Sequence, residues 1–415
     1  MHFYKFYMLQ CDLKTFLKFT KILLVSPLNI LILFTVFLFS SCSQENDQVE
    51  KEVNQVISFD FEKKTEDWKS VGLIKDVEII PLLGADLLGN PKKILRQKEL
   101  FYFLDKENQF VSIYDTTGKF INKIHDFGRG GNEYSQLVDI LIDSANQQIK
   151  LLSRNDKKLL SYTLDGKKLL NISKLPKVFM NMINDNNTYW GFTANYVDGK
   201  KAKNIWKFDS LFNLKDGYID INPGFASYSN ESITPFSKFG HKRFYIQMMD
   251  NDIYSLNKDE GSVPYYRFDF GSLNWPDKIN TLSKMDNMPL EDKDKYIREI
   301  EIFQETNKFI FIKVTVSGQS LLGVYNKINK TSHIVALNPY IDKYFFSFGE
   351  IISVNEKAIY TLVSANAIRK ILKGKDEFND FEATYPAQIA RLREKFKGLN
   401  FDENSNPFLA TYYLE

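Results

Sequence analysis

From about residue 71 onward, short runs of alternating apolar and polar residues are separated by turns that contain Asp, Asn and Gly. Residues 99–124 contain three such runs, with a polar turn after the first and a D-x-x-G-K turn after the second. Residues 148–172 repeat this order, with Asp165-Gly166-Lys167 in the second turn. Period-two alternation bounded by turn residues is typical of β-strands, and glycine supplies the positive φ of tight hairpins. The pattern predicts an all-β chain built from antiparallel hairpins.

One aromatic residue in the second run of each unit marks the length of the repeat. These aromatic markers are Tyr114, Tyr162, Trp206, Tyr254, Tyr325 and Tyr412, separated by 48, 44, 48, 71 and 87 residues. Separations in the mid-forties match one four-stranded blade of a β-propeller. Six units in series predict a six-bladed β-propeller over residues 71–415, with four antiparallel strands in each blade. An irregular two-sheet sandwich is the alternative, because it also has short strands at regular spacing.

The two long separations each contain a helical pattern. In a first insertion, at about 272–306, apolar residues fall at i, i+4 and i+7: Tyr296, Ile300 and Phe303. In a second, at about 376–398, Ile389, Leu392 and Phe396 fall at i, i+3 and i+7, which is also a helical spacing. Pro386 precedes this second pattern and Gly398 follows it, as is usual at the two ends of a helix. We therefore predict two short helical insertions in the propeller.

The two ends of the repeat region predict how the ring closes. A propeller avoids an exposed sheet edge when a strand from before the first repeat completes the last blade. Residues 76–83 form an apolar run before the first full unit, and residues 406–415 form a final run with no following partner. We expect these two segments to lie side by side.

The first 41 residues have the pattern of an export signal. Four lysines precede an apolar stretch at 22–39, and Ser40 and Ser41 precede Cys42. A basic start, an apolar core and small residues at the cleavage site are typical of a signal peptide. Pro27 and Asn29 interrupt the stretch and leave ten continuous apolar residues, which favours a signal peptide over an uncleaved membrane anchor.

Residues 38–42 resemble the lipobox of bacterial lipoproteins, with Phe39 where a small aliphatic residue is usual. The resemblance implies that Cys42 carries lipid and attaches the protein to a membrane. Residues 42–70 are mostly polar and predict a tether. Because Cys11 leaves with the signal, no cysteine pair remains for a disulfide or a redox site. The expected location is the cell envelope, as an outer-membrane lipoprotein that is periplasmic or surface-exposed.

Composition and charge exclude two classes of protein. The 415 residues are 44% hydrophobic and 15% aromatic, which excludes a disordered chain. Lys and Arg number 54 against 52 Asp and Glu, for a formal net charge of +2. Such a balance does not supply a broad phosphate-binding surface, so we expect no nucleic-acid partner.

Four segments together resemble the six-bladed β-propeller lipoproteins of Bacteroidetes-type bacteria, an NHL-like and mostly uncharacterised family. They are VEIIPLL (77–83), IYDTTGKFINKI (113–124), HDFGRGGNEY (125–134) and NPFLATYYLE (406–415). The third segment contains the family's G-x-G-x-x-E-Y loop, with Gly131 where proline is common. The resemblance implies the fold and an envelope location, and it is nearly silent on activity.

This glycine-rich loop is not a nucleotide site, because a strand pattern follows it where a helix would be needed, and no Lys-Ser/Thr pair follows the glycines. Two roles stay open. Glu133 and Tyr134 could pin one blade to the next. Alternatively, Arg129, Glu133 and Tyr134 could line one mouth of the central channel and bind a ligand, with Trp275 of the first insertion as a cap.

The sequence offers no catalytic residue, metal ligand or cofactor motif that we would assign. His125, His241 and His333 lie in different units without H-x-x-x-H or H-x-E spacing, so each reads as a turn or edge residue. No G-x-S-x-G motif and no cysteine nucleophile is present in the mature chain. Aromatic clusters could stack on glycans, although core packing is the simpler explanation.

These patterns predict a ligand-binding or scaffolding module at the cell envelope, with glycans or surface proteins as partners. The alternative is a lyase or hydrolase with its site in the central channel.

Overall fold

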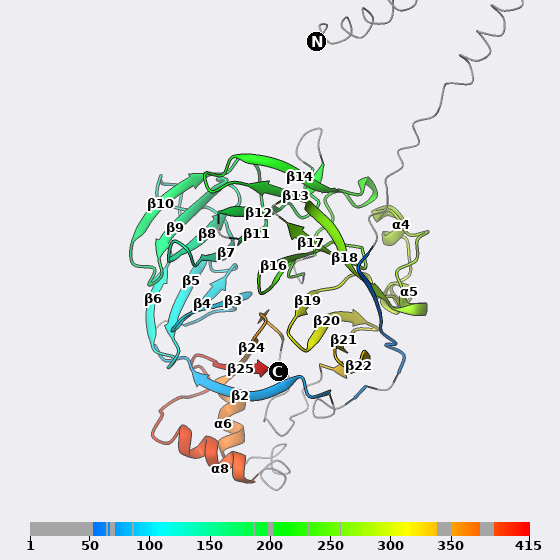
Figure 1. Ribbon diagram of the computed structural model, residues 1–415. Coiled ribbons are helices and arrows are strands. Elements are labelled where there is room, and N and C mark those ends of the chain that lie inside the picture. Colours follow the sequence, from blue (N-terminus) through cyan, green and yellow to red (C-terminus); the bar gives the residue numbers. More distant parts are fainter. Residues whose placement is uncertain are drawn as a thin grey trace, which may run out of the picture. The chain divides into compact units, whose positions relative to one another are not determined.

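The computed structural model describes residues 53–63, 65–66, 71–84, 87–185, 187–197, 202–230, 233–257, 259–337, 350–373 and 386–415. Residues Val53–Glu415 form one compact unit. In this unit, six small antiparallel sheets surround a central axis (Figure 1). The protein is a six-bladed β-propeller, as the repeat predicted. No helix within the described residues is long and apolar enough to cross a membrane.

The strands of each blade follow one another from the central channel outward. Blade 1 contains β3 (Lys93–Gln97), β4 (Leu100–Asp105), β5 (Phe110–Asp115) and β6 (Phe120–Ile124). Blade 2 contains β7 (Leu137–Asp143), β8 (Gln148–Ser153), β9 (Lys158–Thr163) and β10 (Leu169–Lys174). Blade 3 contains β11 (Asn181–Asp185), β12 (Thr188–Phe192), β13 (Lys203–Phe208) and β14 (Leu214–Asp220).

The second half of the ring is built in the same way. Blade 4 contains β15 (Phe236–Phe239), β16 (Lys242–Ile246), β17 (Asp252–Asn257) and β18 (Gly261–Asp269). Blade 5 contains β19 (Ile302–Glu305), β20 (Phe309–Val316), β21 (Gln319–Asn326) and β22 (Thr331–Ala336). Blade 6 contains β23 (Ser353–Val354), β24 (Ala358–Val363), β25 (Phe408–Leu414) and, as its outer strand, β2 (Ile74–Pro81).

The aromatic markers of the repeat occupy equivalent positions in the structure. All six lie on the third strand of a blade, on β5, β9, β13, β17, β21 and β25. The third strand packs between two others of its sheet, so a large side chain there fills the space between neighbouring blades. Tyr114 and Tyr412 illustrate this, since both are fully buried. The spacing of the aromatic markers therefore corresponds to the repeat of the blades.

Ring closure is confirmed. The outer strand β2 comes from the start of the propeller and pairs antiparallel with β25, from Ile74 opposite Leu414 to Pro81 opposite Phe408. Figure 1 shows the blue β2 beside the red β25. The last blade is thereby completed by a strand that precedes the first blade in the sequence.

The segment before β2 departs from the predicted tether. The tether was predicted over 42–70, of which 42–52 lie outside the described residues. Within it, β1 (Gln55–Ser58) pairs in parallel with β18 and adds a fifth strand to blade 4. Ile57, Phe59 and Phe61 are buried while the residues between them are exposed. This period-two pattern shows that residues 55–61 belong to the folded unit.

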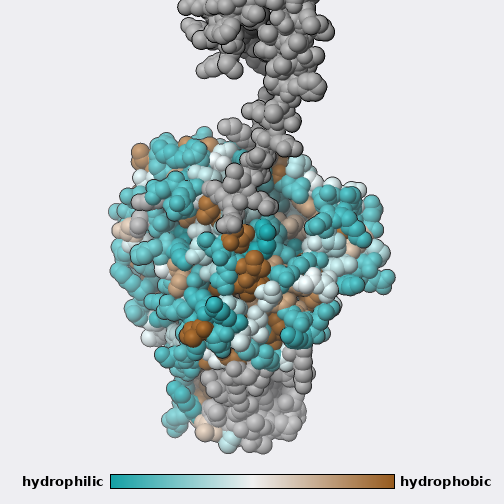
Figure 2. Space-filling model, turned by 45° about the vertical axis from the view of Figure 1, so that its right-hand side comes forward, coloured by the Kyte–Doolittle hydropathy of each residue, from teal (hydrophilic) through white to brown (hydrophobic). Residues whose placement is uncertain are grey.

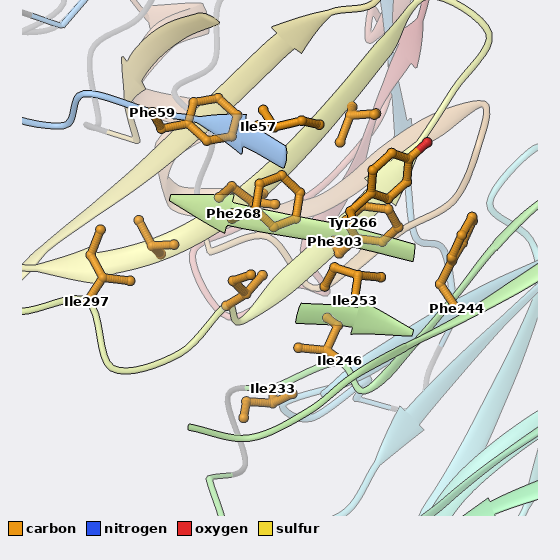
Figure 3. Packing of buried hydrophobic residues seen from close by; sticks show 14 of the residues in the cluster. Ile57, Phe59, Ile233, Phe244, Ile246, Ile253, Tyr266, Phe268, Ile297 and Phe303 are labelled. Carbon is orange, nitrogen blue, oxygen red and sulfur yellow. The ribbon is translucent and has the colours of Figure 1, made fainter. Parts of the chain in front are cut away.

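These N-terminal side chains enter the space between blades 4 and 5. Figure 3 shows Ile57 and Phe59 above Phe268, and the Phe59 and Phe268 ring centroids lie 5.9 Å apart. Gly323 on β21 leaves the room, because a Cβ there would come within 3.0 Å of the Phe59 ring. Residues 53–63 and 65–66 thus form a strap along the outer strands of two blades, β18 and β22.

The helical insertions are confirmed in part. The second contains α8 (Pro386–Lys395) with the predicted residues Ile389 and Leu392 buried, Phe396 is buried directly after the helix, and Gly398 has φ +80°. A helix that the sequence analysis missed, α6 (Ala365–Lys373), precedes α8 between β24 and β25. Residues 374–385 lie outside the described part of the chain.

The helix expected through Tyr296, Ile300 and Phe303 is wrong. The first insertion instead contains α4 (Leu282–Asp286) and α5 (Leu290–Lys295), with two 3-10 turns nearby, η1 (Pro223–Phe225) and η2 (Gly271–Leu273). Tyr296 follows α5 in extended conformation, and Phe303 already lies on β19. Ile300 and Phe303 are buried, so the apolar spacing came from core contacts of a loop and a strand.

The two ends of the central channel are built differently. Each inner strand leaves the channel through a hairpin turn of two to four residues. Each enters it from a connection between blades, and these connections are six to 32 residues long. The long connections therefore lie at the end of the channel where the inner strands begin, which we call the entry end. Long connections on a rigid scaffold are where binding and catalytic residues are usually found.

Candidate functional site

The central channel is a concave feature of the described unit that all six blades surround. It has a volume of about 620 Å³, and its wall is formed by residues of all six inner strands β3, β7, β11, β15, β19 and β23. Cavities of roughly 300–1,000 Å³ are the usual size of small-molecule sites. The channel is therefore a candidate site on the axis, to which every blade contributes.

A buried carboxylate joins three blades in the channel wall. Asp139 on β7 is fully buried, and its Oδ1 accepts a hydrogen bond from Lys93 Nζ of blade 1 at 2.7 Å. Its Oδ2 accepts a hydrogen bond from the backbone N–H of Met182 in blade 3 at 2.9 Å. Because both oxygens are used, this carboxylate holds the wall together and is not free for a ligand.

A similar junction joins blades 3 and 4. Arg243 is buried at the start of β16 and donates to Asp185 Oδ1 at 3.0 Å and to the carbonyl oxygen of Asn184 at 3.2 Å. Burial lowers the pKa of its guanidinium, and the nearby Asp185 opposes that shift. Between blades 6 and 1, the backbone N–H of Ile94 donates to Ser353 Oγ at 2.7 Å.

The hairpin-turn end of the channel is narrowed by a contact between blades that are not neighbours. The backbone N–H of Gly240, in the first turn of blade 4, donates to Glu356 Oε2, in the first turn of blade 6, at 2.7 Å. This contact joins blades 4 and 6 directly, although blade 5 lies between them in the ring. Ligand access is therefore expected from the end with the long connections.

Tyr134 has an architectural position. Its side chain is fully buried against residues of blades 1 and 2, and its hydroxyl donates to the carbonyl oxygen of Gln109 at 2.7 Å. Burial raises the pKa of this phenol, and the charge of Asp126 raises it further. A ligand cannot reach the buried aromatic ring of Tyr134, so the structure favours the alternative in which this side chain holds blades 1 and 2 together.

Glu133 explains the glycines of the same loop. Its Oε2 accepts a hydrogen bond from the backbone N–H of Gly130 at 2.6 Å. A Cβ at Gly128 would lie 2.0 Å from that oxygen, and one at Gly130 would lie 3.0 Å from it. The G-x-G-x-x-E-Y pattern is therefore a self-contained turn, in which the glycines make room for the carboxylate that closes it.

Arg129 and Trp275 do not meet. Arg129 is exposed in the connection between blades 1 and 2. Trp275 lies in the connection between blades 4 and 5, where its Nε1 donates to the carbonyl oxygen of Ile279 at 2.9 Å. The two connections are on opposite sides of the ring (Figure 1). None of the four predicted ligand residues, Arg129, Glu133, Tyr134 and Trp275, lines the channel.

Tyr134→Phe is expected to destabilise the protein by about 0.5–1.5 kcal/mol, because it leaves the buried carbonyl of Gln109 without its donor. Denaturant unfolding measures the change. Arg129→Ala is the matched control from the same loop and should leave the midpoint unchanged, because the side chain is exposed. Equal midpoints for Tyr134→Phe and wild type would contradict the architectural role.

The histidines do not converge on the axis. His125 stacks on Phe127 in the connection between blades 1 and 2, and His241 lies in a hairpin turn. His333 is on the outer strand β22, where its Nδ1 lies 2.9 Å from Glu66 Oε1 of the strap. Within the described residues, no group of three or more His, Cys, Asp or Glu side chains is arranged to hold a metal ion.

Sequence reasoning missed the residues that do line the channel. They lie on or directly beside the first strand of a unit, and the channel wall includes Lys92, Lys93, Asp139, Asn181, Lys238 and Ser353. A signal existed, because the repeat itself gives the position of each first strand. Charged or amide residues inside those otherwise apolar strands were the available clue.

The comparisons with known proteins agree with the fold. A family model described as "Domain of unknown function (DUF4934)" matches residues 54–413. The structure is similar to that of a protein from Bacteroides fragilis NCTC 9343 that is inferred to be exported. The two are 18% identical, with a TM-score of 0.66 over 87% of this chain and 99% of that one.

A second solved structure, of a DUF4221 family member from Bacteroides vulgatus, is 10% identical with a TM-score of 0.47, over 83% of this chain and 97% of that one. No curated protein matches the sequence.

Proposed function

We propose that this protein, which belongs to the DUF4934 family, is an exported ligand-binding β-propeller of the cell envelope with its binding site in the central channel. Glycans are the leading class of ligand, and partner proteins are the second. The observation that carries the proposal is the channel of about 620 Å³, lined by all six inner strands and entered past the long connections.

Two further observations support a binding role for polar ligands. The face of the molecule seen in Figure 2 is mainly hydrophilic, with apolar residues in small groups. The channel wall is held by hydrogen bonds and ion pairs between blades, such as that of Lys93 with Asp139. A rigid wall of this kind presents its remaining polar groups to a ligand without a large ordering cost.

Blocking the channel tests the proposal. Thr234 is exposed in the channel wall just before β15, and its backbone N–H donates a hydrogen bond to the carbonyl oxygen of Glu301. Thr234→Trp should reduce binding of the full chain, in detergent, to an array of neutral and acidic glycans by more than tenfold. Leu211→Trp, at an 80% exposed turn position outside the channel, is the matched control and should bind like wild type.

The array result can contradict the proposal in two ways. Undiminished glycan binding by Thr234→Trp would place the site elsewhere on the molecule. Absence of binding to every glycan on the array would reject glycans as the ligand class and leave partner proteins to be tested by the same pair of variants.

Export and lipid attachment belong to the same proposal. Cys42 and the signal at 1–41 lie outside the described residues, and the support is the lipobox-like sequence before Cys42. Cys42→Ala should abolish incorporation of radiolabelled palmitate and leave the precursor unprocessed. Cys11→Ala is the control and should be labelled normally. Palmitate on the Cys42→Ala protein would reject lipidation at this residue.

A further inference from the structure

We infer that the channel ligand is an anionic oligosaccharide, a short sugar chain with carboxylate or sulfate groups. The inference rests on the proposed binding function and adds the sign of the ligand's charge. It comes from the ionisable side chains of the channel wall, from how they are paired, and from the neutral polar groups beside them.

Basic groups outnumber acidic groups in the wall. The seven basic residues are Lys92, Lys93, Arg96, Lys106, Lys238, Arg243 and Lys313, and the three acidic residues are Asp139, Asp143 and Glu350. Acids behind the wall reduce the excess, since Arg243 pairs with Asp185 and Lys313 with Glu301. The buried Lys150 adds one basic group behind the wall, with its Nζ 3.5 Å from Asp143 Oδ2. Basic groups remain in excess after these acids are counted.

Two of the three acidic groups of the wall, Asp139 and Asp143, already have hydrogen-bond partners within the protein. Asp139 is bonded by Lys93 and by the backbone of Met182. Burial opposes ionisation of Asp143, but hydrogen bonds from Asn146 and Tyr189 outweigh it and hold the pKa below its ordinary value. Both carboxylates are therefore compensated by partners within the protein, and they add little repulsion toward an incoming anion.

Two lysines of the wall have no ion pair within 4 Å among the described residues. Lys92 lies at the entry end, just before β3, and Lys238 lies near the far end of β15. Burial lowers the pKa of Lys238, and the like charge of Arg243 lowers it further, while Glu356 and Asp185 oppose the shift. An anion close to Lys238 and Arg243 would relieve that repulsion, and the low-dielectric walls strengthen the attraction.

The neutral part of the wall suits a sugar better than a bare ion. Amide and hydroxyl side chains lie between the charged ones: Gln97, Ser144, Asn181, Asn184 and Thr234. Such groups pair with the hydroxyls of a carbohydrate. A channel of about 620 Å³ also exceeds what a single inorganic anion would fill. Charge and lining together point to an acidic oligosaccharide.

The test measures binding of defined probes to the full chain in detergent by titration calorimetry. The probes are trigalacturonic acid, a chondroitin sulfate tetrasaccharide, the neutral sugar maltotriose and inorganic sulfate. We expect at least one acidic sugar to bind tenfold or more tightly than maltotriose and sulfate, and to bind more weakly as salt rises from 20 to 200 mM. The preferred acidic probe distinguishes carboxylate from sulfate recognition.

The charge-reversal variant Lys92→Glu/Lys238→Glu should weaken acidic-sugar binding by more than tenfold, whereas Lys174→Glu, at an exposed position of β10, should not. Both lysines of the double variant are exposed, so unchanged melting is expected and verifies folding. Equal or tighter binding of maltotriose, if lost in Thr234→Trp, would overturn the anionic inference and keep the proposed function. Acidic-sugar binding that survives both channel variants would overturn both. Absence of binding to both acidic probes would overturn the inference alone, because the glycan array decides the proposed function separately.

Discussion

Disrupting the closing strand β2 is expected to abolish cooperative folding of the whole propeller. Strand β2 supplies the outer edge of blade 6, and its residues Ile74, Ile79 and Ile80 are buried against two core clusters. Consecutive N–H groups of a strand point to opposite sides, so in Glu78→Pro/Ile79→Pro one of the two lost donors faces β25. Opening this seam exposes the edge of β25, which is a template for aggregation.

Thermal unfolding followed by circular dichroism, with light scattering, measures this effect. A loss of the sharp transition or a fall in melting temperature of more than about 10 °C is expected, which for a chain of this size corresponds to several kcal/mol. Gly131→Pro is the matched control. Gly131 occupies the second position of the turn closed by the hydrogen bond from Glu133 N to Gly130 O, where proline is favoured. A double variant that melts like wild type would show that the ring is held closed without β2.

The second large effect is expected at the carboxylate that joins blades 1, 2 and 3. Asp139→Ala leaves Lys93 without its ion partner and the backbone N–H of Met182 without an acceptor. Removing one member of a buried pair costs about 3–5 kcal/mol. Because Lys93 is 25% exposed and can reach water, the lower end of that range applies. Denaturant unfolding measures the loss as a shift of the midpoint.

A double variant separates the effect of the ion pair from that of the hydrogen bond to Met182. Asp139→Asn/Lys93→Met removes both charges and keeps an acceptor for Met182, so it should recover much of the stability that Asp139→Ala loses. Asp259→Ala, at an exposed turn carboxylate, should change stability by less than about 0.5 kcal/mol. A cost for Asp139→Ala as small as that of Asp259→Ala would mean that the wall does not depend on this carboxylate.

The missed strap shows how a real signal can be overlooked. Residues 55–61 alternate in burial with Ile57, Phe59 and Phe61 inside, which is the period of a strand. The surrounding polar residues made the segment look like a continuation of the tether. A strand added to the outside of a blade is stabilised by a partner more than 200 residues away, here β18. Local sequence pattern says nothing about that partner.

The false helix at Tyr296–Phe303 has a related cause. Spacing of i, i+4 and i+7 is typical of a helix, but any segment whose buried residues happen to follow it gives the same pattern. Here Ile300 and Phe303 are buried because a loop turns inward and becomes β19. For the second insertion, Pro386 and Gly398 marked the ends of the helix in addition to the spacing, and that prediction was confirmed.

The sequence by itself determined the number of blades, their order and the closing strand, because these follow from strand period, turn residues and a repeat of one large aromatic residue per unit. It did not determine the site. Which side chains line the channel depends on how far each inner strand is rotated toward the axis, and that rotation is set by packing between blades. The contact of Tyr134 with the neighbouring blade and the place of Lys238 in the channel wall both depend on the packing of the blades into a ring. A channel is made by neighbours distant in sequence, so its charge could be counted only in the tertiary structure.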